Sequence, residues 1–166
     1  MAEGLRDRLI GAWRLAEFSV IARDDSVTHP MGEDLEGLII YSPDGYVSGQ
    51  LMKPGRPAYA SGDIEHGTTE ELAAAAAGDL AYAGPFHVDE EAATLRHHMS
   101  VSLFPNWIGD TQERFVELDG DTLTIFTAPV IVKDIELTPR LIWKRATPNP
   151  GLDRASAWTL RTCRPS

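Results

Sequence analysis

Short runs in which apolar and polar residues alternate recur along most of the chain, separated by Gly, Pro, Asn and Asp. This pattern is typical of antiparallel strands in an all-β sandwich or barrel. We count about eight strands with mostly local connections and find no internal repeat. The runs are AWRLAEFSVIA, GLIIYSPDGYVSGQLM with a turn at 42–45, LAYAGPFHV, ATLRHHMSVS, TQERFVEL, TLTIFTA and RLIWKRA.

Two segments follow a helical pattern instead. A short amphipathic stretch at 5–10 precedes the first strand, and the run TTEELAAAAAGD predicts one further helix near 68–77. Thr68 or Thr69 can cap this second helix, and Gly78 ends it.

The turn at 119–120, Asp-Gly, predicts a tight hairpin in which Leu118 pairs with Asp121. Side chains alternate across a strand, so one face of this hairpin joins aliphatic residues to a few polar ones. That face holds Gln112, Arg114, Val116, Leu123, Ile125 and Thr127. We interpret it as the interior. Phe115 and Phe126 then point outward, where such an apolar pair is often a dimer contact.

The preceding hairpin, with a turn at 89–92 that pairs Val88 with Ala93, decides the orientation of two adjacent histidines. Its apolar face holds Tyr82, Phe86, Val88, Leu95, His97, Met99 and Val101. His97 is therefore expected inside and His98 outside, so the two cannot bind one metal ion together. The other three histidines show no metal-ligand spacing, and we expect no metal site.

The hairpin at 38–52 leaves the choice of face open. One face holds Leu38, Ile40, Val47 and Leu51, and the other holds Tyr41, Tyr46, Ser48, Gln50 and Met52. Ligand cavities often mix polar and aromatic groups, so either face can line the interior. Gln50 is a candidate ligand-binding residue if the second face does.

Composition narrows the class of protein. The 166 residues fit one domain, which we place at 1–146 with a C-terminal extension at 147–166. The net charge of −10 disfavours nucleic acid and anionic membranes as partners. The single cysteine, Cys163, excludes an intrachain disulfide. No apolar run reaches membrane-spanning length and no secretory signal is visible, so we expect a cytoplasmic location.

Two short motifs carry a family resemblance. The first strand contains GAW at 11–13, and the last contains WKR at 143–145. This pairing resembles the lipocalin superfamily. The order of LIGAWRL, GLIIYSPDGYVS, AYAGPFHVDE, HHMSVSLFPNWIGDTQERFVELDGDTLTI and LIWKR is similar to that in the small microbial "lipocalin-like domain" family. The likeness covers most of the chain.

The resemblance implies an eight-stranded antiparallel barrel that forms a cup with one open end. It also implies that Trp13 and Arg145 meet by cation–π stacking at the closed end. Some lipocalin-fold proteins of microbial natural-product pathways act as cofactor-independent cyclases or isomerases, which makes turnover one implied activity.

Two inward residues are candidates for chemistry. His97 can serve as a general acid or base, or can be a neutral buried histidine bonded to a tyrosine or a carbonyl. Arg114 cannot lose its charge, so its burial requires an acid, a carbonyl cluster or an anionic or enolate ligand. Glu17 can be that acid, because Trp13, Leu15 and Glu17 share a strand face. Trp107, in the FPNWIGD loop, either seals the barrel or covers a ligand.

We therefore expect a barrel that binds an apolar, oxygenated small molecule, such as a polyketide or terpenoid, and that cyclises or isomerises it without a cofactor. His97 and Arg114 are the expected catalytic residues. The expected ligand-binding residues are Tyr82, Phe86, Leu95, Met99, Gln112, Trp107, Gln50 and Glu17. The alternatives are a non-catalytic carrier or sensor, and a dimerisation domain with a filled core.

Overall fold

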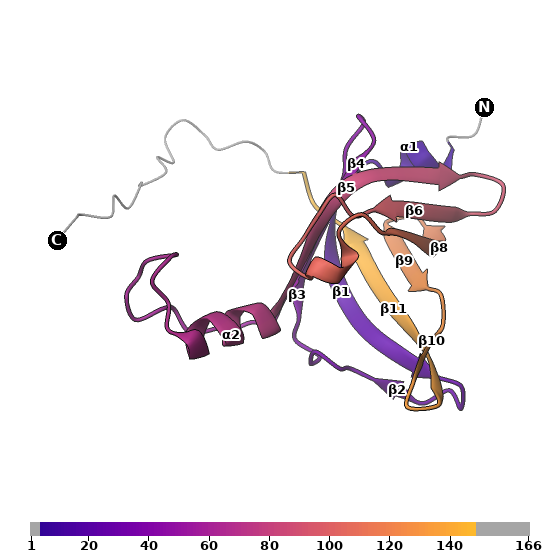
Figure 1. Ribbon diagram of the computed structural model, residues 1–166. Helices are drawn as coiled ribbons and strands as arrows, with labels where there is room; N and C mark the ends of the chain where they lie inside the picture. Colours follow the sequence, from indigo (N-terminus) through magenta and orange to yellow (C-terminus); the bar gives the residue numbers. More distant parts are fainter. Residues whose placement is uncertain (1–3, 149–166) are drawn as a thin grey trace.

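Eight antiparallel strands close into a ring in the computed structural model, which describes residues 4–148 (Figure 1). The ring is closed where the first strand pairs with the last, Trp13 with Arg145. In ring order the strands are β1 (Gly11–Ala22), β3 (Glu36–Tyr41), β4 (Tyr46–Met52), β5 (Asp79–Asp89), β6 (Thr94–His98), β8 (Thr111–Asp119), β9 (Thr122–Thr127) and β11 (Ile135–Arg145). The predicted eight-stranded barrel is confirmed.

Three short strands lie outside the ring: β2 (Val27–Thr28) pairs with β1, β7 (Val101–Ser102) pairs with β5, and β10 (Val130–Val132) pairs with β11. Each belongs to a connection between ring strands. A 3-10 turn, η1 (Pro105–Trp107), lies in the β6–β8 connection.

Both predicted helices are present. Helix α1 (Leu5–Leu9) precedes β1, and α2 (Thr69–Ala77) lies between β4 and β5. Thr68 caps α2 and forms a capping box with Glu71. No residue of α2 is buried, and Figure 1 shows this helix standing away from the barrel.

The closed end is held by the contact that the WKR and GAW motifs imply. The Arg145 guanidinium lies 4.0 Å from the centre of the Trp13 ring and donates hydrogen bonds to the Arg8 and Ile10 carbonyls. The Trp13 indole donates to the Leu9 carbonyl at 2.9 Å. Trp13 is fully buried, so this contact ties α1, β1 and β11 into one unit.

The predicted interior faces of the two later hairpins are correct except at Val101, although both registers are wrong by two residues. Leu118 pairs with Leu123 instead of Asp121, and Val88 pairs with Leu95 instead of Ala93. Both turns therefore close differently from our prediction. A shift of two preserves the alternation, which is why the faces survive.

The prediction that Glu17 faces inward with Trp13 and Leu15 is wrong. A β-bulge between Leu15 and Glu17 inserts one extra residue in β1 relative to β11, and alternation changes phase there. Phe18 takes the inward position instead.

The hairpin of β3 and β4 mixes our two proposed faces. Ile39 pairs with Gly49 and Tyr41 pairs with Val47, and all four are buried. Leu38 and Ile40 lie outside. The fully buried side chains of the barrel are Trp13, Trp143, Tyr41, Leu9, Ile39, Leu95, Met99, Leu123, His97, Val47 and Ser19.

Val101 was predicted inside and is 60% exposed. Strand β6 ends at His98, and the chain turns before β7, so the alternation does not continue through Met99 and Ser100. The predicted extension at 147–166 falls almost entirely outside the described residues. Within residues 4–148, no helix is long and apolar enough to cross a membrane.

Candidate ligand-binding site

A cavity of about 570 Å³ lies inside the barrel. Met31, Trp107 and Val130 line it from the β1–β3, β6–β8 and β9–β11 connections, which lie at one end of an antiparallel ring. The cavity therefore opens at the end opposite the Trp13–Arg145 contact. Its other lining residues are Phe18, Leu51, Leu80, Tyr82, Gln112, Glu113, Arg114, Ile125, Thr127, Ala128, Pro139, Leu141 and Trp143.

The volume suits a ligand with one or two rings, because small-molecule sites usually measure about 300–1,000 Å³. The walls are mainly aliphatic and aromatic, with few polar groups among them. Such a surface stabilises apolar ligands by burial and orients them through those polar groups.

Arg114, on β8, supplies the positive charge of the cavity. Its guanidinium donates to the side-chain oxygen of Gln112 and to the Glu113 carbonyl. Gln112 in turn donates to the Asp110 carboxylate at 3.3 Å. None of the ion pairs formed within residues 4–148 includes Arg114.

Burial lowers the pKa of Arg114, while Tyr82, Tyr41 and Asp110 act in the opposite direction. An arginine keeps its proton through such a shift. The cavity thus contains a cation whose direct hydrogen-bond partners are neutral oxygens.

The expected Glu17–Arg114 pair is not formed. Glu17 instead accepts a hydrogen bond from Arg140 at 2.8 Å, and His29 lies 3.9 Å away. Hydrogen bonds from Ser19 and then Arg140 lower the pKa of Glu17. The β1 bulge is the physical reason, since it places Glu17 outside the cavity lining.

Two aromatic side chains lie against each other in the cavity. The Tyr82 and Trp107 rings meet edge to face with centroids 6.0 Å apart, and Phe104 also meets Trp107 edge to face, at 5.8 Å. Burial raises the pKa of Tyr82, with Arg114 opposing the rise. Tyr82 is therefore a neutral phenol at physiological pH. Trp107 lines the cavity from the β6–β8 connection.

His97 faces the interior as predicted, but it is not among the residues that line the cavity. Its Nε2 lies 3.1 Å from the Tyr41 hydroxyl, and its ring centroid lies 6.0 Å from that of Tyr82. Burial, and secondarily the charge of Arg114, lowers the pKa of His97 to about 3. The imidazole is neutral at physiological pH. His98 lies on the other face, 3.0 Å from the Thr111 hydroxyl.

Of the other expected ligand residues, Tyr82, Gln112 and Trp107 line the cavity. Phe86, Leu95 and Met99 belong to the packed interior outside the lining. Gln50 is exposed on the outer face, where it pairs in register with Leu38. The prediction for Gln50 is wrong because Tyr41, the residue we grouped with it, lies on the opposite face.

Sequence reasoning missed part of the wall. Phe18 faces the cavity because the bulge changes the alternation of β1, which the sequence pattern does not show. Leu80 lies just before the part of β5 that we aligned. Leu141 and Trp143 alternate with the outward Lys144, so the same period-two pattern applied to RLIWKRA would have identified both.

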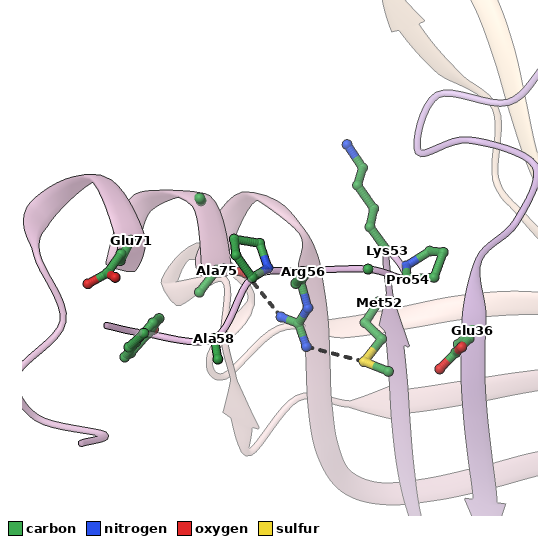
Figure 2. Close-up of a pocket in the computed structure, with 12 residues that line it drawn as sticks. Glu36, Met52, Lys53, Pro54, Arg56, Ala58, Glu71 and Ala75 are labelled. Carbon is green, nitrogen blue, oxygen red and sulfur yellow. Dashed lines mark hydrogen bonds between the residues drawn. The ribbon is translucent and has the colours of Figure 1, made fainter. Parts of the chain in front are cut away.

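A second hollow, of about 470 Å³, lies between α2 and the loop before it (Figure 2). Its arginine, Arg56, is already engaged. Arg56 donates to the Ala75 carbonyl, to the Met52 sulfur at 3.2 Å and to Asp79, with which it forms an ion pair. This hollow lies outside the barrel, and its other cation, Lys53, is exposed.

Comparison with known proteins agrees with the closed eight-stranded barrel. Residues 10–146 match the family model described as "Lipocalin-like domain". The chain is 40% identical over 106 residues to the 4'-hydroxy-3'-methoxypropiophenone carrier protein ppsC of Aspergillus oryzae, which covers 60% of this chain and 96% of that protein. No solved structure matches.

Proposed function

Because this chain belongs to the lipocalin-like domain family, we propose that its barrel binds an oxygenated aromatic small molecule and carries it without converting it. The observation that carries the proposal is Arg114, a cation that lies inside a largely apolar cavity and forms no ion pair among the described residues. The ligand supplies an acidic acceptor oxygen, and the apolar walls hold its ring.

The chemistry of the relative supports this class of ligand. The name of the A. oryzae protein describes a carrier of an aromatic ketone that bears a hydroxyl and a methoxy group. A phenol of this kind is acidic enough to share or lose its proton beside a guanidinium. Arg114 would then hold the phenolic oxygen, with the Tyr82 hydroxyl available as a second, neutral donor.

A cofactor-independent cyclase or isomerase is the second candidate. Arg114 and Tyr82 on one cavity wall favour it, because both can stabilise negative charge that develops on a carbonyl oxygen. The expected proton-transfer residue, His97, supports it less. Its Nε2 is engaged by Tyr41, it does not line the cavity, and its low pKa makes it a weak base.

The test uses two probes that differ only at the acidic oxygen, 4'-hydroxypropiophenone and its methyl ether 4'-methoxypropiophenone. Isothermal titration calorimetry measures both against the full chain and against Arg114→Gln. We expect the hydroxyl probe to bind more tightly, and Arg114→Gln to weaken it roughly tenfold or more, as for a charge-assisted hydrogen bond. The methyl ether should lose much less.

Arg14→Gln is the matched control, because Arg14 is exposed on the outer face of β1 and pairs in register with the outward Leu38. It should leave both affinities unchanged. Failure of both probes to bind the wild-type chain contradicts the proposed function. Chromatography of each probe after prolonged incubation separates the two candidates, since a new product would contradict the carrier and support the cyclase or isomerase.

A further inference from the structure

The cation of the ligand cavity is connected to a carboxylate through a neutral amide. Arg114 lines the cavity, and its guanidinium donates to the side-chain oxygen of Gln112. The Gln112 side-chain nitrogen in turn donates to the Asp110 carboxylate at 3.3 Å. Gln112 and Arg114 are two residues apart on β8, so both lie on its inner face, and Asp110 comes just before the strand. A carboxamide therefore stands between the cation and the nearby acid.

Three other partly buried arginines are arranged differently. Arg56, Arg140 and Arg145 each pair directly with a carboxylate, at 3.2, 2.8 and 3.1 Å. Because a carboxylate in contact offsets the charge of the guanidinium, such an arginine attracts a second anion only weakly. Arg114 differs from them, because the two oxygens that it contacts belong to an amide side chain and a peptide group.

The orientation of the Gln112 amide is fixed at both ends. A guanidinium only donates, so it must face the amide oxygen, and an ionised carboxylate only accepts, so it must face the amide nitrogen. Asp110 is itself held in place. Its N–H donates to the Trp107 carbonyl at 2.9 Å, and its carbonyl accepts from the Met99 N–H at 2.8 Å. Its carboxylate also accepts from the Thr111 N–H at 2.9 Å. The amide therefore links the guanidinium to an anchored group.

Arg114 keeps donors that a ligand can use. Each of its terminal nitrogens engages one acceptor, which leaves the other N–H on that nitrogen without a partner among the described residues. The side chain is partly exposed and lines the cavity. The adjacent acid, Glu113, gives Arg114 only its peptide carbonyl and pairs its carboxylate with Arg96 at 3.6 Å. The cation is thus held by neutral oxygens and still has N–H groups to donate.

We propose that Gln112 is a positioning residue, whose amide holds the Arg114 guanidinium in the cavity wall without cancelling its charge and so makes the site select an acidic ligand oxygen over an ether. This inference rests on the proposed function and deepens it. Gln112 acts on the ligand through Arg114. The ligand class is an aromatic molecule whose ring carries an ionisable hydroxyl.

The experiment titrates 4'-hydroxypropiophenone and 4'-methoxypropiophenone into the wild-type chain and two variants at one pH. Gln112→Glu keeps the shape of the side chain and gives Arg114 a carboxylate partner, which competes with the ligand. We expect it to weaken the hydroxyl probe roughly tenfold or more. Gln112→Met keeps the length and removes both hydrogen bonds, and should weaken that probe about 3- to 10-fold. The methyl ether should change less than about twofold in both variants, which also shows that the cavity is intact.

The ultraviolet spectrum of the bound hydroxyl probe is a second readout, because loss of the phenolic proton moves its absorption to longer wavelength. At saturation, the wild-type complex should absorb more at the longer wavelength than the Gln112→Glu complex, and identical spectra contradict the inference. Gln50→Glu is the matched control. Gln50 is exposed on the outer face of β4, so the same added charge should leave both affinities and the spectrum unchanged.

The failure of this inference can be told from the failure of the proposed function. An unchanged affinity of the hydroxyl probe in either Gln112 variant, or equal losses for the two probes, overturns the positioning role. The proposed function then stands, because it is tested by Arg114→Gln. If neither probe binds the wild-type chain, the proposed function itself fails and the inference fails with it.

Discussion

Gly49 lies against the phenol ring of Tyr82, so closely that a β-carbon at position 49 would come within 2.7 Å of Tyr82 Cζ. The two residues pair in register on β4 and β5. Tyr82 lines the ligand cavity. The cavity wall can keep this shape only because Gly49 has no side chain.

Gly49→Ala should therefore displace the Tyr82 ring and disturb its contact with Trp107. We expect a loss of about 1–3 kcal/mol in the free energy of unfolding, typical of an overpacked interior. Affinity for 4'-hydroxypropiophenone should fall as well. Urea denaturation and calorimetry measure the two effects. Ser48→Ala, on the outer face of the same strand, is the control, and an unchanged Gly49→Ala variant would contradict the close contact.

Arg145→Met should loosen the closed end of the barrel. It removes the cation over the Trp13 ring and the hydrogen bonds to the Arg8 and Ile10 carbonyls. A cation–π contact is worth about 0.5–2 kcal/mol and each hydrogen bond about 1 kcal/mol, so we expect a loss of roughly 2–4 kcal/mol. The denaturation midpoint measures it. Lys144→Met removes only an exposed hydrogen bond to Thr122 and should change stability by less than about 0.5 kcal/mol.

The buried imidazole of His97 makes stability depend on pH. Its pKa falls from 6.5 to about 3 on folding, so the unfolded chain binds the proton more readily. This contribution is complete above pH 6.5 and is lost as the pH falls toward 3. Between pH 7 and pH 5 the free energy of unfolding should drop by roughly 2 kcal/mol from this residue.

Urea denaturation at pH 7 and pH 5 measures that drop, and NMR titration of the ring follows the imidazole directly. The His97 signals should remain those of a neutral ring at pH 5. A midpoint above pH 5 would show that the proton enters the folded barrel and would contradict the assignment. His98→Gln, which removes a histidine from the opposite face, should leave the pH-dependence attributed to His97 in place.

The inner face of β8 and β9 could be predicted because alternation is insensitive to an error of two residues. Our register for this hairpin was wrong, yet Arg114, Gln112 and Thr127 were still placed on the correct side. The Trp13–Arg145 contact was predictable for a different reason, since two short motifs at opposite ends of the chain imply it.

Glu17 shows what a sequence pattern does not contain. The bulge in β1 leaves no distinctive residue behind, since Ala16 lies among ordinary strand residues, and alternation changes phase without warning. Gln50 failed because β3 and β4 carry apolar or aromatic residues on both faces, which leaves the period-two pattern ambiguous.

His97 illustrates a third limit. Alternation places a side chain inside or outside a barrel, but it does not distinguish packed interior from ligand space. That distinction depends on how neighbouring rings fill the volume, here Tyr41, Tyr82 and Phe86 around the imidazole. Only the three-dimensional structure separates packed interior from ligand space.

The pairing of β1 with β11 also orders events during folding. These two strands come from opposite ends of the barrel sequence, so their union carries the largest loop-closure cost in the ring. A nascent chain cannot complete the barrel until β11 has left the ribosome. Trp143 belongs to that strand, so a ligand meets a complete cavity wall only after β11 has emerged and paired with β1.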